Sequence, residues 1–325
     1  MKKLLASALL LLALLLPILV KANSILIPMD DAQKDHLKSY GIAFWILTND
    51  ETVDWLLNYR GGSFMSKYSK KLEDECRVRG ISYDVISDAA TKDIVTQVND
   101  PSVNMNLVKL EKAPKIAVYS PKEGLKPSDD AVIIALKYAE IPFDIIYDEE
   151  ILKNELPKYD WLHLHHEDFT GQYSKMGKGK PTEKFIANKT LQEATAHKFN
   201  FRKVSKMKLS VAQHIRDFCA AGGYLFAMCS GADSFDIALA SANTDIVEEE
   251  YDGDPVDRNA QSKLDYSQTF AFQNFKVELD GNLRQFSDID VTHTRHIGIN
   301  MEFAFTNIGS NKARSRRAEA KSFFN

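Results

Sequence analysis

Residues 224–240, YLFAMCSGADSFDIALA, begin with an apolar stretch, narrow to Cys229-Ser230-Gly231, and resume with apolar residues at helical spacing. The first part predicts a buried strand and the last part predicts a helix. A side chain at such a strand-to-helix turn is held away from the sheet, and the first amide groups of the helix point towards whatever it attacks. Cys229 is therefore a candidate nucleophile. The alternative is a small, inert residue that fills the end of the sheet.

The segments before this turn alternate between strands and helices. Apolar runs predict strands in KIAVYSP (115–121), FDIIYDEE (143–150) and YDWLHLHHED (159–168), and helical spacing predicts helices at 127–140, 209–223 and 232–240. Residues 171–208 are polar, lysine-rich and poor in pattern, and the stretch 177–185 within them reads as a lysine-rich loop. Continuous apolar strands alternating with helices predict an α/β fold with a doubly wound parallel sheet covered on both faces.

The composition is that of an ordinary globular protein. The chain has 325 residues, of which 44% are hydrophobic and 26% charged, with a formal net charge of −4. Such a chain can bury one large core or two modest ones. Nucleic-acid-binding domains usually carry a concentrated basic face, so the charge balance predicts no nucleic-acid partner.

The chain divides into four predicted regions. We expect a signal peptide at 1–22, an N-terminal α+β region at 23–110, the α/β domain at 111–310 and a basic tail at 311–325. Within the α+β region, 41–50 and 81–87 read as strands around a helix at 66–80. In the α/β domain, 244–257 reads as an exposed acidic loop, and 269–280 and 297–309 read as β-rich segments.

The first 22 residues have the features of a secretory signal: Lys2 and Lys3, an apolar run, and the sequence Val20-Lys21-Ala22. We expect an exported protein, periplasmic or secreted, with no stable membrane anchor after cleavage. An uncleaved anchor is the alternative, because the run approaches the length that spans a bilayer. Export also favours disulfides, and pairing of Cys76 with Cys219 would leave Cys229 as the free thiol.

Residues 115–240, centred on AAGGYLFAMCSGADSFDIALA (220–240), resemble the class I glutamine amidotransferase-like superfamily, which includes PfpI-type and ThuA-like proteins. The resemblance implies a flavodoxin-like sheet with a cysteine nucleophile on the turn after a strand. The family's elbow reads Gly-x-Cys-x-Gly, where this chain has Ala227 at the first glycine, and the chain lacks the family's downstream His-Pro-Glu. The histidine is then expected at His293 or His296, with Glu302 as a possible third member.

The chain also resembles exported bacterial proteins labelled asparagine synthetase B, through residues 30–47, 53–64 and 161–175. That label implies glutamine hydrolysis and ATP-dependent amide formation. The phosphate loop of such synthetases reads Ser-Gly-Gly-x-Asp-Ser, and this chain offers the shorter SGADS at 230–234. Consecutive amide groups at a helix start could supply part of a phosphate cradle.

Five of the eight histidines fall in two stretches, 163–166 and 293–296. On a strand, His163 and His165 share a face and could bind Zn²⁺, with a third ligand from the second stretch. The alternative is that they are hydrogen-bonded core residues. At the end of the same strand, His166, Glu167 and Asp168 face the crevice where doubly wound folds bind ligands, which predicts substrate binding or acid–base roles for them, although a solvated polar turn would also explain them.

These observations predict cysteine-dependent hydrolysis or transfer at an amide-type carbonyl of a small-molecule substrate. Cys229 would attack, His293 or His296 would take the proton, and the Ser230 amide beside Gly231 would hold the oxyanion. The helix dipole would favour the thiolate. We expect no cofactor in this scheme. Two alternatives remain: a non-catalytic binding protein on the same fold, and a metal-assisted hydrolase that uses zinc at the histidines.

Overall fold

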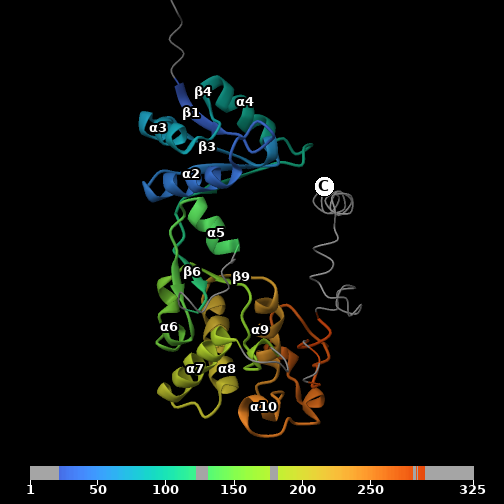
Figure 1. The fold of residues 1–325 in the computed structure, drawn as a ribbon. Helices are drawn as coiled ribbons and strands as arrows, with labels where there is room; N and C mark the ends of the chain where they lie inside the picture. The colour runs from blue at the N-terminus through green and yellow to red at the C-terminus, as the bar shows by residue number, and fades with distance from the viewer. Residues whose placement is uncertain (1–21, 122–130, 176–181, 281–282, 284, 290–325) are drawn as a thin grey trace, which may run out of the picture. The chain divides into compact units, whose positions relative to one another are not determined.

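The computed structural model describes residues 22–121, 131–175, 182–280, 283 and 285–289 (Figure 1). Contacts divide the chain into two compact units. The first comprises residues 1–118, 126–145 and 158–161, and the second comprises 119–125, 146–157 and 162–325. Residues 1–21 of the predicted signal peptide and the predicted basic tail lie outside the described residues, whereas Ala22, the last residue of the predicted signal peptide, begins a strand.

The first unit contains a five-stranded sheet of order β4-β1-β3-β2-β5, in which the strand pairs are antiparallel. The strands are β1 (Ala22–Ile27), β2 (Val53–Leu57), β3 (Ser63–Lys67), β4 (Asp84–Ser87) and β5 (Asn106–Leu110), and the turn η1 is Tyr59–Gly61. Successive side chains on a strand face opposite sides. Ile25 and Ile27 of β1 accordingly belong to one core cluster, and Leu26 between them belongs to another.

Helices cover both faces of this sheet. The cluster around Ile25 includes Ile42 of α2 (His36–Thr48) and Leu72 of α3 (Lys70–Arg79), whereas the cluster around Leu26 includes Ile94 of α4 (Asp88–Val98). The predicted helix at 66–80 and the strand at 81–87 are confirmed by α3 and β4.

The predicted strand at 41–50 is wrong, because most of this stretch lies in α2. Asp35 caps the helix, and its carboxylate accepts a hydrogen bond from the Lys38 amide at 3.0 Å. Ile42 and Ile46 are four residues apart and both buried, which is the spacing of one helix face. A short apolar run does not distinguish a strand from a buried helix, and here the cap upstream decides the structure.

The second sheet has four parallel strands in the order β7-β6-β8-β9. They are β6 (Ile116–Tyr119), β7 (Asp144–Ile146), β8 (Trp161–Leu164) and β9 (Tyr224–Ala227), which confirms the four strands predicted in this region. At their carboxyl ends, the Ser120 amide donates to Ile146 O at 3.0 Å and the Met228 amide donates to Leu164 O at 3.1 Å. These bonds align the segments that follow the strands.

The helices that accompany the second sheet include α8, which packs against both α6 and α9. Their bounds are α5 (Ala131–Tyr138), α6 (Asp148–Leu152), α7 (Glu183–Lys198), α8 (Val204–Ala220), α9 (Ser230–Ala240) and α10 (Glu249–Asp252). The short turns are η2 (Leu156–Lys158), η3 (Tyr173–Lys175), η4 (Ala260–Lys263) and η5 (Tyr266–Gln268). The predicted helices at 127–140, 209–223 and 232–240 correspond to parts of α5, α8 and α9.

The expectation that the sheet is covered on both faces is wrong for β9. Tyr224 and Phe226 are 63% and 45% exposed. β9 is an edge strand of the second sheet, and the face that carries Tyr224 and Phe226 is exposed to solvent.

The stretch 171–208, which carries little sequence pattern, contains α7 and the beginning of α8, and α7 already begins within the predicted loop at 177–185. Thr182 caps α7 by accepting from the Phe185 amide at 3.2 Å. The buried residues of α7 are Gln192, Thr195 and Ala196. Because the buried face is largely polar, the sequence of this helix shows little apolar periodicity.

Residues 269–280 do not form the predicted β-rich segment. In the described part of this region, the β-pairing is limited to an isolated antiparallel bridge between Val277 and Ser287. The buried carboxylate of Asp236 instead accepts from the amides of Phe270, Ala271 and Phe272, each at 2.8 Å. The β-rich segment predicted at 297–309 lies outside the described residues.

The acidic stretch 244–257 is only partly the predicted exposed loop. It contains α10, and Ile246 and Val247 are 4% and 1% exposed. Among the described residues, no helix is both long and apolar enough to cross a lipid bilayer.

Candidate active site

Cys229 lies between the end of β9 and the start of α9, which confirms the predicted strand-to-helix turn. Its backbone has φ 52° and ψ −141°, and the residue is exposed. A residue other than glycine at positive φ costs about 1–3 kcal/mol, and the surrounding structure must hold it there. The turn therefore presents the thiol to solvent at the carboxyl end of the sheet.

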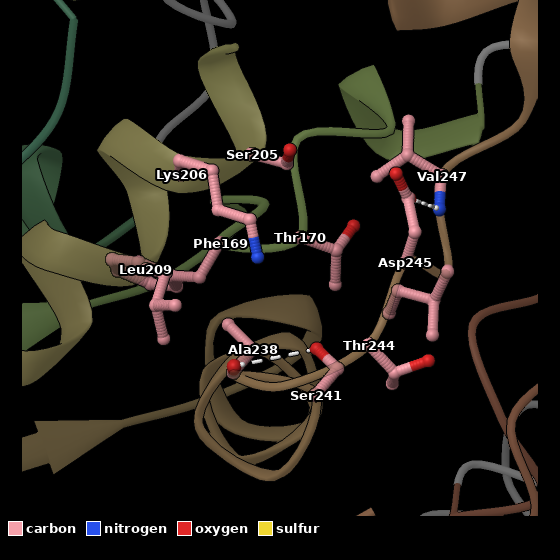
Figure 2. A pocket seen from close by; sticks show the side chains of 11 residues that line it. Phe169, Thr170, Ser205, Lys206, Leu209, Ala238, Ser241, Thr244, Asp245 and Val247 are labelled. Atoms are coloured by element: carbon pink, nitrogen blue, oxygen red, sulfur yellow. Dashed lines mark hydrogen bonds between the residues drawn. The ribbon is translucent and has the colours of Figure 1, made fainter. Parts of the chain in front are cut away.

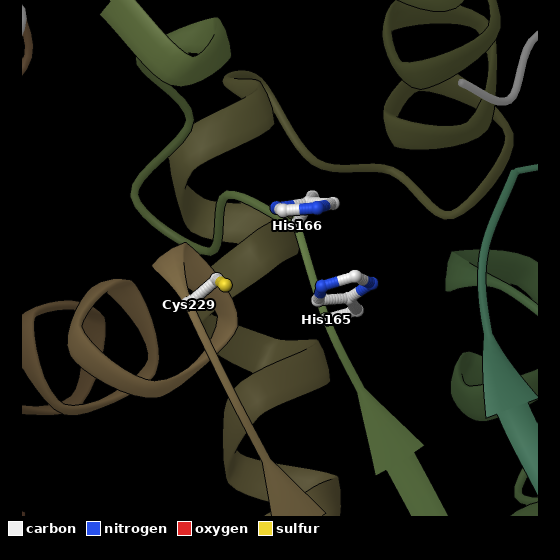
Figure 3. A group of neighbouring side chains, drawn as sticks. All are labelled: His165, His166 and Cys229. Carbon is white, nitrogen blue, oxygen red and sulfur yellow. The ribbon is translucent and has the colours of Figure 1, made fainter. Parts of the chain in front are cut away.

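Two histidines lie beside this thiol (Figure 3). His165 and His166 follow β8, and one ring nitrogen of each lies with Cys229 Sγ in a group whose atoms are all within 4.8 Å of one another. The two rings stack with centroids 3.6 Å apart. His165 is half-buried, whereas His166 is exposed. These three residues are called the Cys229 cluster.

The neighbouring strands β8 and β9 bring this cluster together. The Gly231 amide donates to His165 O at 2.7 Å, and the Met228 amide donates to Leu164 O. Both bonds join the segment after β8 to the turn after β9. The positions of His165 and Cys229 are therefore set by one local framework.

His163 does not join the cluster. It is 1% exposed, and its ring stacks on Phe226 with centroids 5.6 Å apart. The predicted pairing of His163 with His165 as metal ligands is thus replaced by a pairing of His165 with His166. His163 occupies the core position that was the alternative interpretation.

Glu167 and Asp168 follow the cluster but point elsewhere. Glu167 Oε2 accepts from the Tyr147 hydroxyl at 3.3 Å, and burial raises the pKa of the Glu167 carboxyl to about 7 against the opposing effect of the Lys208 charge. Asp168 is buried and accepts from the Thr170 amide at 2.7 Å and the Thr170 hydroxyl at 2.6 Å. These contacts join the two carboxylates to Tyr147 and Thr170, and the expected acid–base roles stay predictions.

A buried polar network lies beneath Glu167, at the ends of β6 and β7. Lys208 and Asp148 are 0% and 1% exposed, and Lys208 Nζ lies 2.9 Å from Asp148 Oδ2. The Tyr119 hydroxyl donates to Asp148, and Lys208 Nζ donates to the Tyr119 hydroxyl at 3.0 Å. Burial, followed by the charges of the neighbouring carboxylates, raises the pKa of Tyr119 well above its ordinary value.

Sequence reasoning missed this network, although a signal existed. Lys208 stands four residues after Val204 and three before Val211, on the buried face of α8. A lysine within an apolar helix face requires a buried partner, because an unpaired buried charge is very costly. The predicted helix began at Leu209 and so left Lys208 out.

The segment SGADS (230–234) forms the first turn of α9. The Gly231 and Ala232 amides donate to carbonyl groups, and the Ser234 amide donates to Asp233 Oδ1 at 2.7 Å. Ser234 Oγ donates to Glu167 O at 2.9 Å. These groups hold the turn together and are not arranged as an open phosphate cradle.

The three cysteines are all free, so the hypothesis that Cys76 pairs with Cys219 is wrong. Cys76 is packed in the core of the first unit. Burial raises the pKa of Cys76 to about 12 and that of Cys219 to about 11. Both behave as apolar core or near-core residues.

His293, His296 and Glu302 lie outside the described residues, and their expected roles stay predictions. Within the described part of the chain, the imidazoles that lie near Cys229 are those of His165 and His166. The two adjacent histidines in LHLHHED (162–168) indicate a base at this position, because they follow a predicted strand that ends beside the turn at Cys229.

Two cavities of the second unit lie apart from the Cys229 cluster, since none of its three residues lines them. The cavity in Figure 2, between Phe169, Ser205 and Ser241, has about 20 Å³, room for about one water molecule. A larger cavity of about 550 Å³ is lined by residues that include Tyr173, Lys203 and Tyr251.

Comparison with known proteins found no match: no family model, no curated protein and no solved structure matches this chain. Its function is therefore inferred from the arrangement of its own side chains.

Proposed function

We propose that the protein is an exported thiol enzyme that hydrolyses or transfers at an amide-type carbonyl of a small-molecule substrate, with Cys229 as the nucleophile. The observation that carries the proposal is the exposed Cys229 thiol at positive φ, in a group with two imidazoles whose atoms lie within 4.8 Å. A nucleophile on a strained turn with an adjacent base is the usual arrangement for covalent acyl chemistry.

In the proposed reaction, His165 or His166 accepts the thiol proton, and the sulfur attacks the carbonyl carbon. The C–N bond then breaks, the imidazolium gives its proton to the leaving amine, and an acyl-thioester remains on Cys229. Water or an acceptor amine attacks the thioester and restores the thiol. This assignment replaces His293 and His296 as the base with the histidines that follow β8.

The oxyanion requires an amide donor near the sulfur. Of the first amides of α9, that of Gly231 donates to His165 O and that of Ala232 donates to Cys229 O. The proposal therefore gives the oxyanion to the Ser230 amide, the first of the helix. The helix N-terminus adds a favourable dipole.

Fold and sequence agree with a flavodoxin-like, amidotransferase-like domain. Numbered within their own sheet, the strands β7-β6-β8-β9 have the order 2-1-3-4, which is that of the first four strands of the flavodoxin-like sheet. Export is proposed from the signal-like residues 1–22 alone.

The test is alkylation by iodoacetamide at pH 6.5, followed by mass spectrometry of the cysteine-containing peptides. We expect Cys229 to react at least about ten-fold faster than a free thiol such as glutathione, because an adjacent imidazole can accept the thiol proton as the sulfur attacks. His165→Asn and His166→Asn test the base, and His197→Asn, at an exposed histidine of α7, is the matched control. A rate no faster than that of glutathione would exclude the nucleophile.

Acyl transfer is tested with p-nitrophenyl acetate, which releases a chromophore when a nucleophile is acylated. The wild type should show a burst of one equivalent and an acetyl group on Cys229, and Cys229→Ala should show neither. Release without acetylation of Cys229 contradicts the covalent mechanism.

A non-catalytic binding role is the second candidate, favoured by the cavity of about 550 Å³ that does not contain Cys229. Its volume lies within the usual range for small-molecule sites, about 300–1,000 Å³. A ligand retained there would add a constant mass to the protein in native mass spectrometry. That mass should persist in Cys229→Ala and be reduced in Arg202→Ala, which removes a charged side chain from the cavity lining.

A further inference from the structure

We propose that His165, His166 and Cys229 form a binding site for one divalent transition-metal ion of the Zn²⁺ class. The inference uses the same side chains as the proposed enzyme but does not require that the thiol attack a substrate. It differs from the expected zinc site, which relied on His163.

The ligand chemistry of the cluster is selective. A thiolate and two imidazoles are the soft and borderline donors that Zn²⁺ and Co²⁺ prefer, whereas Ca²⁺ and Mg²⁺ require oxygen ligands. Three protein ligands leave a fourth tetrahedral position for water or substrate. Exposure of His166 and Cys229 gives that position access to solvent.

The distances are compatible with closure around an ion. Zn–N bonds of about 2.0–2.1 Å and Zn–S bonds of about 2.3 Å place tetrahedral ligand atoms roughly 3.3–3.6 Å apart. The ligand atoms of the Cys229 cluster already lie within 4.8 Å of one another. Rotation of the exposed His166 and Cys229 side chains can supply the remaining movement of at most about 1.5 Å.

The framework beneath the site limits how far the ligands can separate. His165 and Cys229 are on neighbouring strand ends, which the bond from the Gly231 amide to His165 O joins at 2.7 Å. Cys229 is held at φ 52° by the start of α9. Two of the three ligands are therefore positioned by backbone and are not carried on independent loops.

A second group of candidate ligands, Asp245, Asp252 and Asp254, gives a useful contrast. The ammonium group of Lys203 already lies among these carboxylates, 2.7 Å from Asp245 and 3.0 Å from Asp252, and it also contacts Asp254. Although burial of Lys203 opposes it, hydrogen bonds with the three carboxylates raise the pKa of the ammonium group. A metal ion would have to displace a cation that is part of the fold, so this group carries no metal proposal.

Metal binding has a direct consequence for the thiol. A sulfur bound to Zn²⁺ cannot be alkylated at the rate of a free thiolate, and binding displaces the thiol proton to the buffer. We therefore expect the ion to protect Cys229 and a chelator to restore its reactivity. In the proposed enzyme, the ion would act as a reversible inhibitor.

The test uses the metal-free full chain titrated with Co²⁺ and then with Zn²⁺. One equivalent of Co²⁺ should produce a thiolate-to-metal charge-transfer band, and one equivalent of Zn²⁺ should remove it. Cys229→Ser should abolish the band. His165→Asn and His166→Asn should each weaken Zn²⁺ binding at least about ten-fold. Loss of a residue that only hydrogen-bonds to a metal ligand already costs about 10–100-fold in affinity, and loss of the ligand itself should cost no less.

Matched controls separate the site from adventitious binding. Cys219→Ser and His197→Asn remove a thiol and an exposed imidazole of the same unit outside the cluster, and both should bind Zn²⁺ as the wild type does. Circular dichroism confirms that each variant is folded. A wild type without the charge-transfer band overturns the proposal, and so does a Zn²⁺ affinity in the three cluster variants that equals that of the wild type.

The two proposals can fail separately. Slow alkylation of the metal-free protein with a normal Co²⁺ spectrum rejects the nucleophile and keeps the metal site. Fast alkylation that one equivalent of Zn²⁺ leaves unchanged rejects the metal site and keeps the nucleophile.

Discussion

Gly231 and His165 approach so closely that only a glycine fits at position 231. The Gly231 amide donates to His165 O at 2.7 Å, and a Cβ on Gly231 would lie 2.5 Å from that same oxygen. This contact joins the strand end that carries two imidazoles to the turn that carries the thiol. The neighbouring His165 carbonyl therefore requires glycine at position 231.

Gly231→Ala should therefore destabilise the protein, although alanine favours a helix more than glycine does. Forcing a methyl group against a backbone carbonyl costs about 1–3 kcal/mol. Urea unfolding should show the loss, and alkylation of Cys229 should slow because the turn moves away from the histidines. Ser230→Ala, in the same turn, adds no atoms and serves as the control. Wild-type stability in Gly231→Ala would show that the approach is looser than described.

Lys208→Met should be severely destabilising, because it leaves Asp148 buried without its charged partner. Breaking a buried ion pair from one side costs about 3–5 kcal/mol. The double variant Lys208→Met/Asp148→Asn removes both charges and should recover a large part of that loss. Lys206→Met, at an exposed lysine of the same helix, should change the free energy of unfolding by no more than about 0.5 kcal/mol. If Lys208→Met and Lys206→Met lowered the free energy of unfolding equally, the burial of the Lys208–Asp148 pair would be contradicted.

The three thiols should respond differently to pH. Burial raises the pKa of Cys76 to about 12 and of Cys219 to about 11, so at pH 8 only roughly one Cys219 thiol in a thousand is ionised. Iodoacetamide at pH 8 should then modify Cys229 in the folded protein and spare the other two. All three should react in 6 M guanidinium chloride. Rapid native labelling of Cys76 would contradict its place in the core.

The sequence predicts the second sheet well because its strands are continuous apolar runs bounded by turn residues. Gly222 and Gly223 end one helix, and the run that follows them is β9. Residues 41–50 mislead because an apolar run fits a buried helix as well as a strand, and Asp35, which decides the case, lies outside the run. Local pattern therefore predicts elements best where their boundaries carry their own signals.

The site is harder to predict, because it depends on which strand lies beside which. The turn at Cys229 follows from one stretch of sequence, but its proximity to His165 and His166 depends on the pairing of the segments after β8 and β9. The bond from the Met228 amide to Leu164 O records that pairing. Without it, His293, His296 and the pair at 165–166 are equivalent candidates for the base.

Glu149 of α6 should give the protein an acid-sensitive component of stability. Hydrogen bonds from Lys153 and Lys198 lower the pKa of the Glu149 carboxyl to about 2, and Lys198 belongs to α7, so the pair joins two helices. A carboxyl whose folded pKa is depressed stabilises the protein above its unfolded pKa, about 4.3, and this stabilisation is lost as the pH falls towards 2. Because the carboxylate is partly exposed, we expect a contribution of about 1 kcal/mol or less.

Glu149→Gln should accordingly lower the free energy of unfolding by about 0.5–1 kcal/mol at pH 7. The difference from the wild type should shrink as the pH falls below about 4 and disappear only below about pH 2, where the wild-type carboxyl becomes mostly protonated. It should also shrink in 1 M NaCl because salt screens exposed charges. Glu155→Gln, which lies in the same unit, is the control. Urea unfolding at pH 7, 4 and 2.5 measures the effect. A difference that stays constant across this range would mean that Glu149 acts through packing and not through its charge.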